Sequence, residues 1–243
     1  MQHLLTFLFI AEISYILVGA DLIRRSTKTR GLPEFFLGLA FVFNGLSYLF
    51  SDLPIIIDNE AIVNEFSFTG RIFAALCALT IGAFTWRVFR SEASWAKWTF
   101  WAASALLLVG LTVSAIEGDW EGAYPLTYKG FWFEWLGGLV PFIWLATESL
   151  HTYSRTRRKV RLGLGDPIVS NRFLLIGLYG TLASCTYPIY LWMYILYERH
   201  GIWSDSLGAF VGIVEIFSLA ALWISFTAPA FYRRWVGETQ PSE

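Results

Sequence analysis

Seven apolar blocks, each close to the length of a membrane-crossing helix, dominate this sequence of 243 residues. A helix needs about 20 predominantly apolar residues to cross a hydrocarbon layer about 30 Å thick. Continuous apolar runs of this length suit helices better than barrel strands, which are shorter and alternate in polarity. The blocks are residues 4–22, 35–50, 66–86, 95–116, 131–150, 173–197 and 207–231. We therefore predict an all-α, polytopic membrane protein, with residues 1–243 forming a single seven-helix domain.

The composition excludes several classes of protein. Hydrophobic residues make up 56% of the chain and charged residues only 15%, whereas soluble domains usually carry about 25% charged residues. A soluble enzyme, a disordered chain and a nucleic-acid-binding module are therefore not expected. The basic run 155–161 is interpreted as a topology signal that meets anionic headgroups. Cys77 and Cys185 fall inside apolar blocks and are interpreted as small core residues, so no disulfide framework is predicted.

The distribution of Lys and Arg predicts the orientation of the helices. Cytoplasmic loops retain basic residues, and the connections after the first, third and fifth blocks, with the C-terminal tail, hold most of them. These basic residues are Arg24, Arg25, Lys28, Arg30, Arg87, Arg90, Lys97, Arg155, Arg157, Arg158, Lys159, Arg161, Arg172, Arg233 and Arg234. We predict an N-terminus outside and a C-terminus in the cytoplasm. The first block lacks a basic segment before it, which indicates a retained helix and not a cleaved signal.

Polar and ionisable residues inside the blocks are the candidate functional positions. An ionised group at mid-depth in a bilayer costs at least about 2.5–3.5 kcal/mol, so such groups normally face inward and have partners. Glu12 and Glu215 fall near the middle of the first and last blocks, which are neighbours in most closed bundles. We predict an outward-opening polar cavity that binds a ligand or carries protons. Its predicted lining is Glu12, Asn44, Arg71, Glu134, Tyr187 and Glu215. The alternative is that these residues form buried pairs that fix helix register without binding anything.

Other features concern packing and chemistry. Pro141 and Pro188 interrupt the fifth and sixth blocks and tend to kink them. Gly137, Gly138 and Gly180 are expected to allow close approach of helices. The three histidines lie near block ends, and phosphate-binding loops, nucleophile elbows and metal-binding motifs are missing. No catalytic residue and no metal site is predicted, and an enzyme is not expected, although intramembrane lipid chemistry with a Glu base stays an alternative.

The sixth and seventh blocks resemble bacteriorhodopsin-like, opsin-fold proteins. The segment 186–192, Thr-Tyr-Pro-Ile-Tyr-Leu-Trp, is similar to an aromatic-Tyr-Pro stretch in the sixth helix of that family, and Glu215 falls close to a carboxylate position of its seventh helix. Arg71 resembles the outer-half arginine of the family's third helix, but residues 72–74 depart from the pattern. Leu219 stands where the resemblance implies the retinal-bearing lysine. Covalent retinal is therefore excluded, and a non-covalent lipid or pigment stays open.

A second resemblance is to uncharacterised bacterial seven-helix inner-membrane proteins. It rests on the helix end Phe-Thr-Trp-Arg-Val-Phe-Arg at residues 84–90 and on the helix start Arg-Phe-Leu-Leu at residues 172–175. This resemblance implies a bacterial source and carries no known activity.

Three functions compete at this point. The first is a receptor-like or sensory protein that binds a small apolar or amphipathic ligand in the outward-facing cavity. The second is a proton-coupled transporter or proton path that uses Glu12 and Glu215. The third is a structural or accessory subunit of a membrane complex. The expected partners are the lipid bilayer, a small ligand, and a cytoplasmic or membrane protein at the basic inner loops; a nucleic acid is not expected, and the oligomeric state is open.

Overall fold

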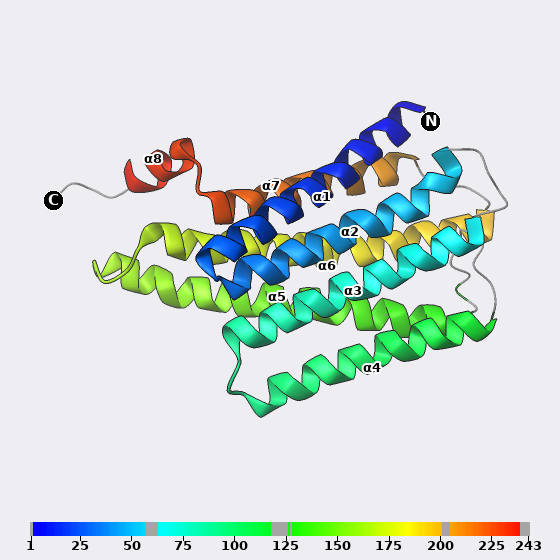
Figure 1. Cartoon of the computed structure of the whole chain (residues 1–243), viewed down its shortest axis with the longest axis horizontal. Coiled ribbons are helices and arrows are strands. Elements are labelled where there is room, and N and C mark those ends of the chain that lie inside the picture. The colour runs from blue at the N-terminus through cyan, green and yellow to red at the C-terminus, as the bar shows by residue number, and fades with distance from the viewer. Residues whose placement is uncertain (1, 57–62, 118–125, 127, 201–204, 239–243) are drawn as a thin grey trace.

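The computed structural model describes residues 2–56, 63–117, 126, 128–200 and 205–238, and these residues form eight helices and no strand (Figure 1). The helices are α1 (Gln2–Thr29), α2 (Leu32–Ile56), α3 (Val63–Phe89), α4 (Ser94–Glu117), α5 (Lys129–Arg161), α6 (Pro167–His200), α7 (Asp205–Thr227) and α8 (Ala230–Glu238). The all-α fold predicted from the apolar blocks is confirmed for the described part of the chain.

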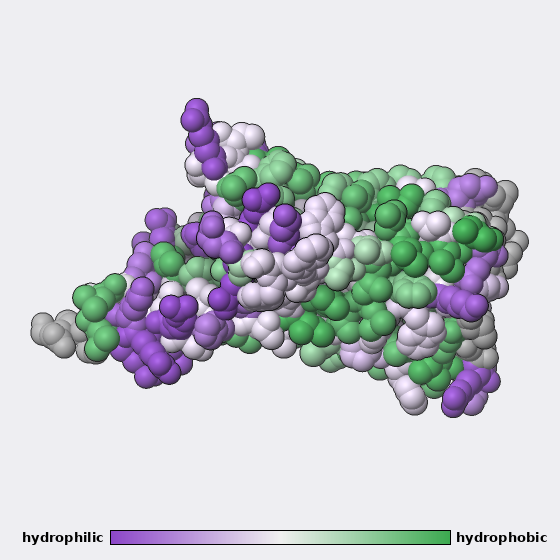
Figure 2. Space-filling view, turned by 90° about the horizontal axis from the view of Figure 1, so that it is seen from below, coloured by the Kyte–Doolittle hydropathy of each residue, from purple (hydrophilic) through white to green (hydrophobic). Residues whose placement is uncertain are grey.

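Five of these helices are long and apolar enough to cross a membrane. The candidate spans are Leu32–Leu53, Glu65–Phe89, Ser94–Glu117, Pro167–Tyr197 and Ser206–Thr227. In Figure 2, hydrophobic side chains cover the middle of the visible face, and hydrophilic ones gather toward its two ends. This is the surface of a multi-pass membrane protein. Membrane crossing by α1 and α5, which would complete seven spans, stays a prediction.

The ends of several helices differ from the predicted block edges. The last block was predicted to continue to residue 231, but α7 ends at Thr227. Ala228 has a positive φ of 39° and precedes Pro229, which has no backbone N–H to donate, so the helix stops there and α8 starts afresh. At the other edges the helices are longer than the apolar blocks, because hydrogen bonding continues past the apolar residues: α5 extends to Arg161 and α6 begins at Pro167.

The helices pack mainly against their neighbours in the sequence, and α7 returns to contact α1. This confirms the expectation that the first and last long helices are adjacent. Helix α3 also contacts α5, so α4 lies at the side of the bundle (Figure 1). The turns α1–α2, α3–α4 and α5–α6 lie at the same end of the bundle as α8; we call this the basic end (Figure 1).

The largest hydrophobic core joins α1, α2, α3, α5, α6 and α7. Its fully buried side chains include Leu22, Leu37, Phe41, Ile81, Phe84, Leu145 and Leu222. Most of these residues belong to the halves of their helices that are nearer the basic end. This half of the bundle therefore has a tightly packed apolar centre.

Close approach between helices depends on glycine at several contacts. A Cβ atom at Gly19 would lie 2.6 Å from the carbonyl oxygen of Gly38, and one at Gly180 would lie 2.8 Å from the amide nitrogen of Ala146. A Cβ at Gly138 would lie 2.6 Å from the Tyr187 hydroxyl. These distances are too short for a side chain, so the predicted close packing at Gly138 and Gly180 is confirmed. Helices α5 and α6 continue through Pro141 and Pro188.

Candidate functional site

Four of the six predicted site residues fall into two polar groups that lie between different helices. Glu134 pairs with Arg71, and Glu12 lies near Glu215. We call the first group, Arg71 with Ser114 and Glu134, the arginine triad. The second group contains six residues on four helices, and we call it the acid–tyrosine cluster. Its members are Glu12, Tyr15, Tyr48, Asp52, Tyr190 and Glu215.

The arginine triad joins α3, α4 and α5. Arg71 donates from Nε to Oε2 of Glu134 at 3.0 Å and from Nη2 to Oε1 of Glu134 at 2.8 Å, which is a bidentate ion pair. The same Nη2 also donates to the Ser114 hydroxyl at 2.7 Å. The Ser114 hydroxyl donates in turn to Oε1 of Glu134 at 2.7 Å. The side chains of Arg71 and Glu134 are 9% and 12% exposed, so the pair is largely removed from solvent.

Glycines explain how three helices come close enough to form the triad. A Cβ at Gly110 of α4 would lie 2.7 Å from the amide nitrogen of Glu134, and a Cβ at Gly130 of α5 would lie 2.8 Å from the amide nitrogen of Ser114. Each glycine therefore lies against the backbone of a triad residue on the opposite helix. The triad pairs opposite charges and shares its hydrogen bonds, as a buried ion pair must if its desolvation is to be offset. This arrangement is typical of an ion pair that links helices structurally, here α3, α4 and α5.

The acid–tyrosine cluster is built around Glu215 of α7. Oε1 of Glu215 accepts a hydrogen bond from the Tyr48 hydroxyl of α2 at 2.5 Å and a longer one from the Tyr190 hydroxyl of α6 at 3.4 Å. The Tyr15 hydroxyl of α1 donates to the backbone carbonyl of Glu215 at 3.1 Å. Three helices thus direct hydroxyl groups at one residue of a fourth.

Two further carboxyl groups adjoin Glu215. Glu12 of α1 is only 3% exposed, and the carboxyl groups of Asp52 on α2 and Glu215 on α7 lie near enough to interact with it. Oε2 of Glu12 is buried and has no hydrogen-bond partner among the described residues. A Cβ at Gly45 would lie 2.7 Å from the carbonyl oxygen of Glu12, so this glycine allows α1 and α2 to approach at this point.

The chemistry of this cluster is that of a proton site. Carboxylates that lie close together in a buried site repel one another, and a proton on one of them relieves the repulsion. The ion pairs found in the described part of the chain use Asp21, Glu134 and Glu148, and none involves Glu12, Asp52 or Glu215. Adjacent carboxylates without a cation cannot all ionise at once. Across the described residues, no group of three or more His, Cys, Asp or Glu side chains is arranged to hold a metal ion.

The remaining two predicted residues belong to neither group. Asn44 is partly buried on α2, and its Oδ1 lies 3.9 Å from the Cys77 sulfur, which donates to it. Tyr187 packs against the rings of Trp135 and Phe142, and its backbone carbonyl accepts from Trp135 Nε1 at 3.4 Å. Tyr187 therefore lines the contact between α5 and α6.

Sequence reasoning missed several members of both groups. Asp52 lies just beyond the predicted end of the second apolar block at residue 50, but α2 continues to Ile56 and carries it into the cluster. Tyr48 and Asp52 are four residues apart and share one face of α2, a spacing that was visible in the sequence. Ser114, Tyr15 and Tyr190 carried no comparable signal, because a serine in an apolar block usually bonds to its own helix and a tyrosine there is usually a packing residue.

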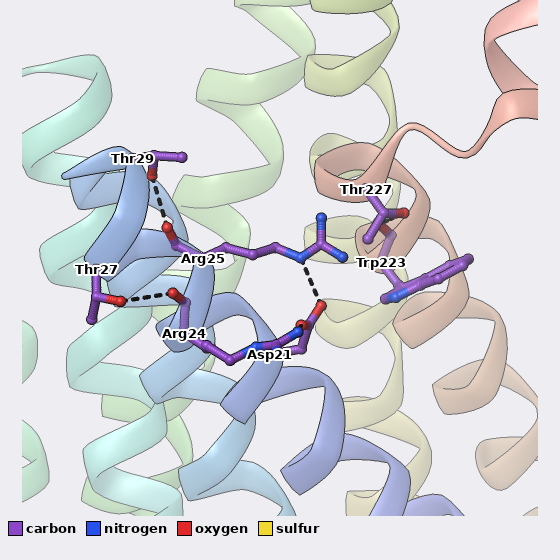
Figure 3. A network of polar contacts seen from close by, with 7 residues as sticks. All are labelled: Asp21, Arg24, Arg25, Thr27, Thr29, Trp223 and Thr227. Carbon is purple, nitrogen blue, oxygen red and sulfur yellow. Dashed lines mark hydrogen bonds and ion pairs between the residues drawn. The ribbon is translucent and has the colours of Figure 1, made fainter.

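At the basic end, one ion pair joins the end of α3 to α5, and two others lie within α1. Arg90 donates from Nε to both carboxylate oxygens of Glu148 on α5, at 2.9 and 3.0 Å. The hydrogen bond to Glu148, and then its charge, raise the pKa of Arg90 above its ordinary value. On α1, Asp21 accepts from Arg24 at 3.0 Å and from Arg25 at 2.7 Å. Figure 3 shows Arg25 directed toward the end of α7, where Trp223 and Thr227 lie.

Comparisons of this chain with protein-family models, with curated proteins and with solved structures gave no match. The resemblances to opsin-fold proteins and to bacterial inner-membrane proteins therefore stay predictions, and the function is argued from the site alone.

Proposed function

We propose that this chain is a sensory membrane protein whose ligand is a proton, bound at the acid–tyrosine cluster. In this proposal α1 to α7 all cross a bacterial inner membrane, with the N-terminus outside. The observation that carries the proposal is the grouping of the Glu12, Asp52 and Glu215 carboxyl groups, none of which takes part in the ion pairs of the described residues. Three carboxyl groups so placed cannot all ionise at once, so the group holds a proton, and gaining or losing that proton changes the repulsion between three helices.

The helices around the cluster provide a means of response. Glu12, Asp52 and Glu215 lie on α1, α2 and α7, and α1 packs against both of the other helices. When the cluster loses its proton, like charges on these helices repel, and the helices separate or rotate to relieve the repulsion. Because α7 leads directly to α8, a movement of α7 reaches the basic end of the bundle. Binding of a proton therefore favours one of two conformations over the other, as binding of a sensory ligand must.

The apolar core favours sensing over proton conduction. Leu22, Phe41 and Leu222 are fully buried between the cluster and the basic end. A proton path needs a continuous series of polar groups or waters, and tightly packed aliphatic and aromatic side chains offer none. The small apolar ligand expected from the sequence stays a prediction, and the hydrogen bonds observed at the Glu215 carboxyl group come from tyrosine hydroxyls of this chain.

Infrared spectroscopy of the protonated carboxyl group tests proton binding. We expect the purified protein at neutral pH to show a protonated-carboxyl band that weakens in Glu12→Gln and in Asp52→Asn. Glu65→Gln is the matched control, because Glu65 is an exposed acid of α3 outside the cluster, and its band should equal that of the wild type. A wild-type protein without the band, or a band insensitive to Glu12 and Asp52, would contradict the proposal.

Reconstitution into liposomes separates sensing from conduction. With a pH-sensitive dye inside the vesicles, we expect an imposed pH gradient to decay no faster with the wild-type protein than with empty vesicles. A faster decay that disappears in Glu215→Gln would instead support a proton path.

Topology is tested in cells with single introduced cysteines. We expect a cysteine at position 158 to react with a membrane-impermeant maleimide only after the inner membrane is opened. Cys77 and Cys185 are first replaced by alanine. Labelling of position 158 in intact spheroplasts would contradict the proposed orientation.

A further inference from the structure

A hollow of about 280 Å³ lies at the basic end, between α5, α6 and α8. Its lining comprises Tyr153, Arg157, Val160, Arg161, Pro167, Ser170, Asn171 and Val236. A second hollow adjoins it and shares Tyr153, Arg157 and Arg161. The lining thus combines two guanidinium groups with two hydroxyls and an amide, and none of its side chains is acidic.

The two arginines are available to an anion. Neither Arg157 nor Arg161 takes part in the ion pairs of the described residues. The Arg157 guanidinium lies 5.8 Å from the centre of the Tyr153 ring, which orients it along the hollow. The nearest acid in the sequence, Asp166, is not part of the lining. Its Oδ1 accepts the backbone N–H of Ile168 at 2.8 Å at the start of α6.

The floor of the hollow is fixed by packing. Ser170 is 3% exposed and accepts a hydrogen bond from the Thr156 hydroxyl at 3.2 Å. On α8, Tyr232 and Val236 are four residues apart, and both are buried. Tyr232 lies near Asn171 of α6, which lines the hollow. The polar groups of α5 and α6 therefore meet in a defined geometry that α8 closes on one side.

The position of α8 indicates the depth of the hollow relative to a membrane. The apolar span of α7 ends at Thr227, and α8 begins at Ala230. Phe231 and Trp235 share the other face of α8 and are 64% and 67% exposed. An exposed aromatic pair directly after a span, on a short helix that also carries Arg233 and Arg234, is typical of a helix lying at the headgroup level.

We propose that this hollow binds the phosphate of an anionic phospholipid headgroup. Arginine pairs with phosphate through two parallel hydrogen bonds, and basic pockets between helices on the cytoplasmic side suit anionic lipid headgroups. The hollow has the charge, the hydrogen-bond donors and the depth for such a headgroup, while Phe231 and Trp235 contact the acyl chains beside it. The inference concerns a site at the opposite end of the bundle from the acid–tyrosine cluster and does not depend on it.

Native mass spectrometry of the full-length protein in detergent, titrated with phosphatidylglycerol, tests this site. We expect Arg157→Gln combined with Arg161→Gln to weaken binding of the first phosphatidylglycerol by about tenfold or more, because each arginine–phosphate contact is charge-assisted. The control is Arg155→Gln combined with Lys159→Gln, which removes the same charge from exposed positions of α5 outside the hollow. Its affinity should stay within about twofold of the wild type.

Two further arms identify the source of the phosphate. Phosphatidylcholine should bind equally to all three proteins, and millimolar inorganic phosphate should not displace phosphatidylglycerol. Equal losses in the two double variants would show a general surface charge effect and overturn the site. Displacement by inorganic phosphate would show a free-anion site and overturn the lipid assignment. Far-ultraviolet circular dichroism of each variant should match the wild type, since all four side chains are exposed.

Discussion

The two buried polar groups of this bundle accommodate buried ionisable side chains in opposite ways. The arginine triad brings one guanidinium and one carboxylate together and adds the Ser114 hydroxyl, so its charges cancel. The acid–tyrosine cluster gathers three carboxyl groups with tyrosine hydroxyls and contains no cation. Both groups are built where glycine lets helix backbones meet, at Gly110 and Gly130 in one case and at Gly45 in the other.

The difference separates structure from function. An ion pair whose charges cancel is not stabilised by binding a proton or another ion, and the arginine triad therefore holds α3, α4 and α5 in one arrangement. A group of acids that ties α1, α2 and α7 has two charge states with different repulsion, and therefore two preferred arrangements. The two groups should respond in opposite directions when one charge is removed from each.

Removal of the cation from the triad should have the largest effect. Arg71→Met leaves Glu134 buried without its partner, and we expect a loss of about 3–5 kcal/mol in the free energy of unfolding. Unfolding in mixed detergent micelles, followed by circular dichroism, measures it. The double variant Arg71→Met with Glu134→Leu should recover most of this loss, because an apolar pair needs no partner. Wild-type stability of the single variant would contradict a structural role for the triad.

Filling the glycine contacts should have an intermediate effect on both groups. Gly110→Ala and Gly45→Ala each place a Cβ within 2.7 Å of a backbone atom on the facing helix. We expect each to cost about 1–3 kcal/mol, because overpacking moves the helices apart. Only Gly45→Ala should also change the protonated-carboxyl band, since it displaces Glu12. The same infrared change in both variants would mean that the two groups are not separate.

Removal of one acid from the cluster should have a small effect on stability. Glu215→Gln keeps an oxygen that accepts from Tyr48 and Tyr190 while removing a negative charge from among like charges. We expect the free energy of unfolding to stay the same or to rise by about 1 kcal/mol. A loss as large as that of Arg71→Met would show that Glu215 is ionised and paired, and would contradict the proposed comparison.

The ion pair at the basic end should matter least. Arg90 is 36% exposed in its pair with Glu148, and ion pairs with this access to solvent contribute about 0–1 kcal/mol. We expect Arg90→Gln to change the unfolding midpoint only slightly, and less at high salt than at low salt. A loss of stability comparable to that of Arg71→Met would show that burial does not decide how much the Arg90–Glu148 and Arg71–Glu134 pairs contribute.

The sequence indicated more about the helices than about the sites. Apolar blocks predicted the helices of the all-α fold because helix length in a bilayer follows directly from composition. The ends of the helices did not follow the block edges: α2 continues past Asp52, and α7 stops at Thr227. Local backbone geometry, and not hydropathy, decides where a helix ends. The small-residue contacts at Gly138 and Gly180 were predictable, since only glycine permits such proximity.

By itself, the amino-acid sequence determined that the chain is helical, apolar enough to cross a membrane several times, and equipped with buried acids and a buried arginine. The tertiary structure decided which of these charges meet. Arg71 faces Glu134, while Glu12 and Glu215 meet Asp52 and the tyrosines. The physical reason is that the desolvation cost of burying a charge follows from the residue type. Which partner offsets that cost depends on which helix faces are turned toward each other by packing.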